Sequence, residues 1–215
     1  MTFNLFRSGW LLLALCAAVG NAQAGNQLYE PMSASVRASL SKAVSDTPVT
    51  NVSFLNNAEG QAWLVEMSKR LAKRMPDPEQ RIDFLSTVRY EAIRAGLDPE
   101  MVLGLIEVES GFKKYAVSSV AARGYMQVMP FWVKVVGTPD QDLFHLRTNL
   151  RYGCNILRLY LDMEKGDLYR ALGRYNGSLG KPEYPTMVVS AWKRHWSYTP
   201  NTQTVQASVV KVAGN

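Results

Sequence analysis

The chain has 215 residues, of which 47% are hydrophobic and 20% charged, and these values are normal for a folded globular protein. This length suits one domain of ordinary size with extra segments at its ends, and it is enough to bury a sizeable core. The formal net charge of +6 favours an anionic partner, which could be a polymer, a membrane surface or nucleic acid, but no nucleic-acid-binding motif is present.

Residues 1–24 have the three parts of a secretory signal peptide. Arg7 supplies the only charge, an apolar run from Gly9 to Val19 follows, and Ala22-Gln23-Ala24 is a small-x-small cleavage pattern. The run is too short to span a bilayer comfortably, so we expect cleavage after Ala24 instead of a retained anchor. A lipoprotein anchored at Cys16 is disfavoured because the residue before it is not small. The sequence therefore predicts an exported protein.

Both ends of the mature chain are expected to be less ordered than its middle. Residues 25–58 are rich in Ser, Asn, Ala and Thr, have weak periodicity, and are predicted to form a partly ordered lead-in. The polar tail over residues 199–215 is predicted to be flexible. Either segment could hold a cell-envelope protein partner.

Residues 59–96 carry two predicted N-terminal helices, separated by Pro76 and Pro78. In the first, an apolar residue recurs at every fourth position. This core-facing stripe consists of Trp63, Met67, Leu71 and Met75. The second begins at Asp77, an N-cap followed by proline in the first turn, and ends at Gly96. Its expected apolar face consists of Ile82, Leu85, Val88 and Ala92.

The predicted main domain, residues 97–198, opens with a helix that should be buried at its centre. Asp98-Pro99-Glu100 repeats the start signal, and the residues that follow, MVLGLIEVES, are apolar nearly all round. A loop rich in Gly and Ser comes next. The spacing thus places a central helix directly before a segment of irregular structure.

Three more helices are predicted beyond residue 140. The first is amphipathic and runs roughly from Thr148 to Met163, and two shorter ones lie near 167–174 and 184–196. The apolar face of the first contains Leu150, Cys154, Leu157 and Leu161. Cys154, the only cysteine left in a mature chain, is interpreted as a small buried hydrophobe and not as a nucleophile. Because no strand alternation appears, the predicted fold class is all-α, or nearly so.

Several kinds of catalytic site are poorly supported by the sequence. His145 and His195 are the only histidines, and no metal-ligand cluster such as HExxH is present. Neither a GxSxG elbow nor a phosphate-cradling glycine loop occurs. The sequence therefore predicts no metal and no cofactor.

Two carboxylates in the predicted central helix are the candidates for chemistry. On a helical wheel Glu109 continues the apolar stripe of Val102, Leu105 and Ile106, whereas Glu107 lies on another side of the helix. Burial against apolar surface and the helix C-terminus both disfavour a negative charge, so we expect a raised pKa for Glu109. A raised pKa suits a general acid near neutral pH. Periodicity alone leaves open a salt-bridged or exposed Glu at a frayed helix end.

From Glu109 the sequence reads ESGFKKYAVSSVAARGYMQVMP, which resembles the signature of the soluble lytic transglycosylase (SLT) family. The shared features are the Glu-Ser pair, Ala116-x-Ser118, a small-residue loop and Gly-x-Met-Gln-x-Met-Pro. A second block, ALGRYNGSLG, is similar to the family's Tyr-Asn block, and the helix between the two blocks also looks similar. The resemblance covers roughly residues 97–196. It implies a lysozyme-like helical domain around a buried catalytic helix.

The resemblance implies a role for each matching residue. Glu109 would be the catalytic acid and base. The residues that would line the sugar cleft or shape it are Ser118, Gln127, Met129, Tyr175 and Asn176, with Tyr175 bonding near Glu109 or the substrate. Each has a plainer interpretation from the residues alone, such as a loop cap for Ser118, a surface polar residue for Gln127 or a core residue for Met129.

Three departures from the family pattern bear on substrate preference more than on activity. Ala121 stands where the family usually has Gly, which adds a methyl group to a tight loop. Tyr125 stands where Leu is usual. The usual Asn-Ala-Gly is here Asn176-Gly177-Ser178.

The activity implied is non-hydrolytic cleavage of the β-1,4 bond between N-acetylmuramic acid (MurNAc) and N-acetylglucosamine (GlcNAc) in peptidoglycan, leaving a 1,6-anhydro end. Two alternatives stay open: a goose-type lysozyme-like hydrolase, and a peptidoglycan-binding module without catalysis. The implied partner is the glycan strand, with no nucleic acid and no membrane span after signal removal. The implied location is the periplasm, because the family is chiefly bacterial.

Overall fold

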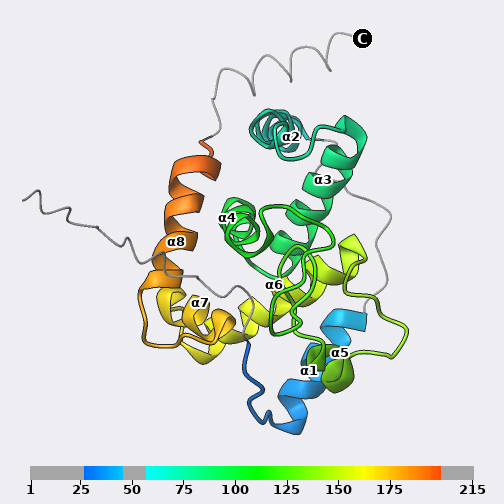
Figure 1. The fold of residues 1–215 in the computed structure, drawn as a ribbon, viewed down its shortest axis with the longest axis vertical. Helices are drawn as coiled ribbons and strands as arrows, with labels where there is room; N and C mark the ends of the chain where they lie inside the picture. Colours follow the sequence, from blue (N-terminus) through cyan, green and yellow to red (C-terminus); the bar gives the residue numbers. More distant parts are fainter. Residues whose placement is uncertain (1–26, 46–56, 200–215) are drawn as a thin grey trace, which may run out of the picture.

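The computed structural model describes residues 27–45 and 57–199, so the predicted signal peptide, with Cys16, and the polar tail lie outside the described residues. Within the described ranges the fold is all-α, as predicted, with two isolated β-bridges and no strand. Its helices are α1 (Ala34–Ser45), α2 (Ala58–Leu71), α3 (Pro78–Arg94), α4 (Pro99–Ser110), α5 (Phe131–Val136), α6 (Leu146–Met163), α7 (Leu168–Asn176) and α8 (Glu183–Ala191), followed by a π-helical turn (Trp192–Trp196) (Figure 1).

Helix α4 is the buried central helix that the sequence predicted. It contacts α3, α8 and the π-helical turn, and Figure 1 shows it in the middle of the molecule. The Asp98 side chain caps its first turn by accepting from Met101 N at 2.9 Å, and Gly111 ends it at a φ of +57°. Gly104 permits the close crossing, since a Cβ there would lie 2.7 Å from the backbone nitrogen of Trp192.

Helix α3 lies close to its predicted boundaries, whereas α2 ends at Leu71, before the predicted stop at Pro76. One predicted face is also partly wrong. The whole stripe from Trp63 to Met75 is buried, as expected. In α3, however, Ile82 is 46% exposed. It lies roughly 120° around the helix axis from Val88, at about 100° per residue, and the buried face is centred on Val88. Phe84 and Glu91 occupy this face instead, and Glu91 pairs with Arg151 of α6 at 3.0 Å.

The lead-in contains a helix, α1, that weak periodicity did not predict. Only Leu40 and Val44, one turn apart, are buried in it. They pack where α1 meets α5 and α6. Tertiary contact therefore stabilises this helix more than its own sequence pattern does.

The three C-terminal helices confirm the predicted order. Helix α6 buries Leu150, Cys154 and Leu157 completely, and burial raises the pKa of the Cys154 thiol well above its ordinary value, an effect that Glu91 reinforces. Cys154 is therefore a buried small hydrophobe, as interpreted. Helix α8 continues into the π-helical turn, which ends close to the predicted boundary. None of the helices in the described ranges is long and apolar enough to cross a membrane.

Candidate active site

Glu109 lies in the last turn of α4 and is 5% exposed. The stripe that it continues, Val102, Leu105 and Ile106, is fully buried, so the face deduced from the helical wheel is confirmed. The hydroxyl of Tyr184, at the start of α8, donates a hydrogen bond to Oε1 of Glu109. A carboxyl group is thus held in the interior by a hydroxyl from a distant part of the chain. The raised pKa expected for Glu109 stays a prediction.

Two buried tyrosines stand close to this carboxyl. Burial raises the pKa of Tyr184 and of Tyr175 well above the ordinary value, and the charge of Glu109 adds to the effect in both. Both hydroxyls therefore remain protonated near neutral pH and act as donors. Tyr175 directs its hydroxyl to the carbonyl of Met126, at 2.7 Å, and so ties α7 to the loop after α4.

The loop over residues 116–130 is held by its own side chains. Ser118 Oγ accepts from Ala122 N at 3.1 Å, which is the loop-capping geometry. Gln127 has a φ of +48°, a left-handed conformation that is uncommon without glycine. Its side-chain amide donates to the carbonyls of Ala116 and Gly124, at 3.1 and 2.8 Å, and the side chain is almost fully buried. The strain at Gln127 is therefore sustained by a dense set of local bonds.

Two further residues, to which the sequence analysis assigned no role, fasten this loop to the helices. Asn149 of α6 accepts from Met126 N at 2.8 Å and donates to the carbonyls of Arg123 and Leu143, each at 2.8 Å. Ser110, which follows the candidate acid, donates to the carbonyl of Tyr125 at 2.8 Å. In the sequence, Asn149 is distinguished only by its position in the helix between the two family-like blocks.

The remaining predicted site residues lie at the edges of the same region. Met129 is half-buried against the core, directly before α5. Asn176 is the last residue of α7 and donates to Ser178 Oγ at 3.2 Å. The structure thus brings Glu109 and Tyr175 together and places Ser118, Gln127 and Met129 on one loop. Their roles toward a sugar stay predictions.

The departure at Ala121 falls on a position with a strained backbone. Ala121 is exposed and has a φ of +66°, where a side chain is disfavoured and glycine is not. The methyl group therefore makes this backbone conformation less favourable. Two hydrogen bonds hold the turn: the Ala121 N–H donates to the Ser118 carbonyl, and the Ser118 N–H donates to the Ala122 carbonyl.

Glu107, the second carboxylate of α4, is engaged on another side of the helix, as the helical wheel indicated. It accepts from Arg74 at 2.6 Å and from the indole nitrogen of Trp196 at 2.7 Å, and His195 Nδ1 lies 3.0 Å away. This cluster joins α4 to the chain after α2 and to the π-helical turn. Glu107 is therefore a structural anchor.

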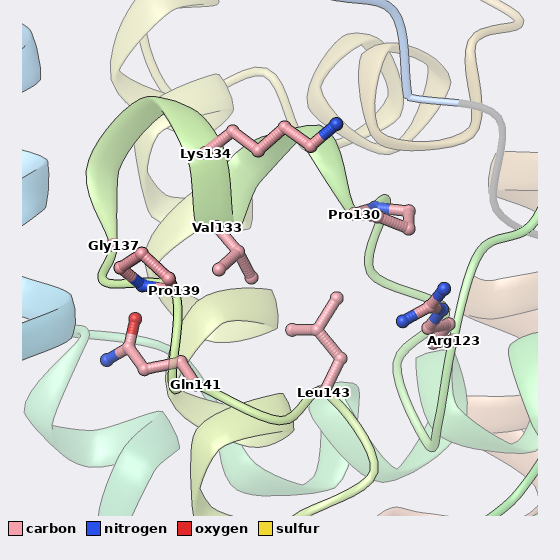
Figure 2. A pocket seen from close by; sticks show the side chains of 8 residues that line it. All are labelled: Arg123, Pro130, Val133, Lys134, Gly137, Pro139, Gln141 and Leu143. Atoms are coloured by element: carbon pink, nitrogen blue, oxygen red, sulfur yellow. The ribbon is translucent and has the colours of Figure 1, made fainter.

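A surface pocket of about 460 Å³ lies beside the loop and does not include Glu109. Figure 2 shows Val133 of α5 and Leu143 facing one another across it, with Arg123 and Lys134 toward its rim. The other lining residues are Pro130, Gly137, Pro139 and Gln141.

In the ranges that the structure describes, no group of three or more His, Cys, Asp or Glu side chains is arranged to hold a metal ion.

Comparison with known proteins gives a family match for part of the chain. A family model described as the transglycosylase SLT domain matches residues 86–184, a range that includes Glu109, the loop and Tyr184. A protein named membrane-bound lytic murein transglycosylase C from Actinobacillus pleuropneumoniae serotype 5b is 51% identical over 61 residues, 28% of this chain. Its namesake from Haemophilus ducreyi is 33% identical over 99 residues, 42% of this chain.

These matches are partial on both sides. They cover 15% and 24% of the length of the two relatives. A further namesake, from Mannheimia succiniciproducens, is 39% identical over 64 residues, which are 16% of its own length. This chain therefore matches less than a quarter of the length of each of these relatives. The chain carries a transglycosylase SLT domain over residues 86–184.

Proposed function

We propose that this protein is a peptidoglycan lytic transglycosylase with Glu109 as its catalytic residue. It cleaves the β-1,4 bond between MurNAc and GlcNAc without water and leaves a 1,6-anhydromuramic end. The observation that carries the proposal is the buried carboxyl of Glu109, which lies inside the SLT match and accepts a hydrogen bond from Tyr184. Burial favours the protonated form that a general acid needs.

The proposed reaction uses one carboxyl group twice. Glu109 first protonates the bridging oxygen, which leaves with the GlcNAc of the departing strand. The acetamide of the MurNAc ring stabilises the cationic centre that forms at C1. Glu109, now a carboxylate, removes the proton from the C6 hydroxyl, and that oxygen closes onto C1. The carboxyl group is protonated again at the end, so no cofactor is consumed.

The position of Glu107 favours a route with a single acid. Most glycosidases place a second carboxylate across the scissile bond. Glu107 is bound to Arg74 and Trp196 on another side of α4, so it is not available for that part. A goose-type hydrolase is the alternative in which another carboxylate, from the loop that holds Asp140 and Asp142, positions a water molecule.

The products released from purified peptidoglycan distinguish these reactions. Mass spectrometry should find sugars lighter by one water than free muropeptides, because the anhydro ring replaces hydrolysis. Products with a free reducing end would instead support the hydrolase. Binding to insoluble peptidoglycan without release of any sugar would support a module that has lost catalysis.

Glu109→Gln tests the assignment of the acid. The amide keeps the size of the side chain and can still accept from Tyr184, but it cannot transfer a proton. We expect the fold to be kept and the release of sugars to fall by roughly 10²-fold or more. Native rates of release by this variant would refute the assignment.

Glu107→Gln is the matched control on the same helix. Because Glu107 lies on another side of the helix, this change should affect catalysis far less than Glu109→Gln does. Since the side chain holds Arg74, His195 and Trp196, we now expect it to lower the thermal stability while the rate per folded molecule stays near the native value.

Export to the periplasm and the glycan strand as partner belong to the same proposal. The net charge of +6 suits an anionic wall polymer. The names of the relatives place those proteins at a membrane and on murein.

A further inference from the structure

The N-terminal strap, defined here as residues Gln27 to Glu30, is bound to the candidate sugar-binding loop. The Gln27 side chain, 2% exposed, donates from Nε2 to the carbonyl of Gln127 at 3.1 Å. Its Oε1 accepts from the backbone N–H of Met129 at 2.9 Å. One planar amide group therefore satisfies both a carbonyl and an N–H. The two residues that supply them lie 100 and 102 positions after Gln27 in the chain.

Neighbouring main-chain groups of this loop are paired inside the SLT domain. The N–H of Gln127 bonds to the carbonyl of Gly124, Val128 exchanges both of its bonds with Arg123, and the N–H of Met126 bonds to Asn149. The carbonyl of Gln127 and the N–H of Met129 differ from these because the strap supplies a partner for each. They form a donor and acceptor pair aimed at an amide.

The strap has two other contacts, one largely exposed and one part-buried. The ring of Tyr29 meets Phe131 edge-on with centroids 5.8 Å apart, although Tyr29 is 57% exposed. Glu30 pairs with Arg174 of α7 at 2.5 Å, and Figure 1 shows the segment (blue) passing α7 on its way to α1. The Arg174 side chain is 19% exposed and that of Glu30 43%, so solvent screens this ion pair in part. Within the strap, Gln27 is therefore the residue with a buried side chain, and its carboxamide is the contact with the loop backbone.

We propose that the Gln127 carbonyl and the Met129 N–H form a binding site for the acetamido group of an N-acetylated sugar, and that Gln27 occupies this site in the free protein. An acetamido group offers one N–H and one C=O in one plane, which is the pair of groups that the glutamine side chain presents here. The inference rests on the proposed function, since sugars of the glycan strand carry acetamido groups. The strap then acts as an internal competitor that each bound strand must displace.

An internal competitor lowers the apparent affinity by the fraction of molecules in which the site is open. Gln27→Ala in the full chain removes the competitor and leaves the loop backbone in place. We expect tri-N-acetylchitotriose, the GlcNAc trimer, to bind this variant roughly threefold to tenfold more tightly than the native protein in isothermal titration calorimetry. Leu28→Ala, a change at an exposed neighbour in the strap, should bind like the native protein.

Cellotriose is the control ligand, because it has the same β-1,4 linkage, is also uncharged and carries no acetamido group. We expect its affinity to be the same for native protein and Gln27→Ala. An equal gain for both trisaccharides would mean that the strap blocks by bulk, and the acetamido assignment would be wrong. Weaker or unchanged binding of the GlcNAc trimer would overturn the proposal, since it would make Gln27 a brace for the loop.

Gln27→Glu provides a second variant if the alanine variant folds poorly. It keeps the size of the side chain but turns a carboxylate oxygen toward the Gln127 carbonyl, so it should release the strap and give the same gain. Binding is measured separately from cleavage. If the variant binds more tightly but the protein releases no sugars from peptidoglycan, only the proposed activity is refuted. If the protein releases sugars but the variant shows no gain in binding, only the proposed acetamido site is refuted.

Discussion

At the scale of single residues, Tyr184 is the group whose role follows from the structure and not from the sequence. Its hydroxyl donates to Glu109, and burial together with that carboxylate raises its own pKa, so it stays a neutral donor. A donor of this kind stabilises the ionised form of a carboxyl group and fixes its orientation. Tyr184 is therefore a positioning residue for Glu109.

Tyr184→Phe should lower the rate of sugar release by roughly tenfold, the effect of one hydrogen bond to a charged group. Because the ionised form of Glu109 loses its donor, the fall of activity with rising pH should begin at a higher pH. Tyr169→Phe, at an exposed tyrosine, is the control. An unchanged profile of activity against pH would leave Tyr184 with a packing role only.

Ala121 carries a cost that one substitution can remove. Its φ of +66° disfavours a side chain by about 1 kcal/mol, and glycine adopts this conformation freely. The greater freedom of glycine in the unfolded chain offsets part of the gain. We expect Ala121→Gly to raise the free energy of unfolding in urea by roughly 0.5 kcal/mol.

The neighbouring alanine supplies the control for this measurement. Ala122 is fully buried and has no positive φ, so Ala122→Gly loses packing without relieving strain and should be destabilising. If both variants lost stability alike, strain at Ala121 would not be the cause.

At the scale of elements, the junction of α2 and α4 contains a titrating group. Burial, and then a hydrogen bond and the charge of Asp98, raise the pKa of Glu100 from 4.5 to about 7. The indole nitrogen of Trp63 donates to its Oε1 at 2.5 Å. Since the folded-state pKa lies above the ordinary value, this group favours folding fully below about pH 4.5. That contribution is lost as the pH rises toward 7.

Glu100→Gln should remove this pH dependence, because the amide still accepts from Trp63 but does not ionise. The melting temperature of the variant should exceed that of the native protein by on the order of 2 °C at pH 8 and match it at pH 4.5, an effect kept small by partial exposure. Glu79→Gln is the control, at an exposed carboxyl in the first turn of α3. A difference that stays constant over this range would show that Glu100 does not titrate as described.

The elements themselves were predictable where the signals are local. Asp77 and Asp98 cap α3 and α4 in the predicted places, and the period of the Trp63 stripe gave the buried face of α2. The face of α3 was partly wrong because Glu91 is buried by its pairing with Arg151, sixty residues away. Apolar periodicity contains no information about a partner so distant in the chain.

The candidate site was predictable to a similar degree. The resemblance located Glu109, and the apolar face behind it followed from helical spacing. Tyr184, Asn149 and Gln27 were missed, because each acts through a contact made only after the chain has folded. None of the three stands in a local pattern that identifies its partner.

At the scale of the whole molecule, one hydrophobic core includes residues on both sides of position 86, where the SLT match begins. Phe84 of α3, ahead of residue 86, packs against Tyr125 of the loop and against Phe112, with ring centroids 4.8 and 5.9 Å apart. Trp63, Met67 and Leu71 of α2 belong to the same buried cluster. The N-terminal helices therefore support the loop that follows the candidate acid.

A chain that begins at residue 97, the predicted start of the main domain, would lack this support. Removing α2 and α3 exposes the apolar surface of α4 and α6 and leaves Arg151 without Glu91, so we expect no cooperative thermal unfolding by circular dichroism and no release of sugars from peptidoglycan. A chain that begins at residue 57 keeps both helices and should unfold cooperatively. If the shorter chain also unfolded cooperatively and retained activity, the helices before residue 97 would be an addition to a self-sufficient domain, and their packing against Phe112 and Tyr125 would not be needed to hold the site.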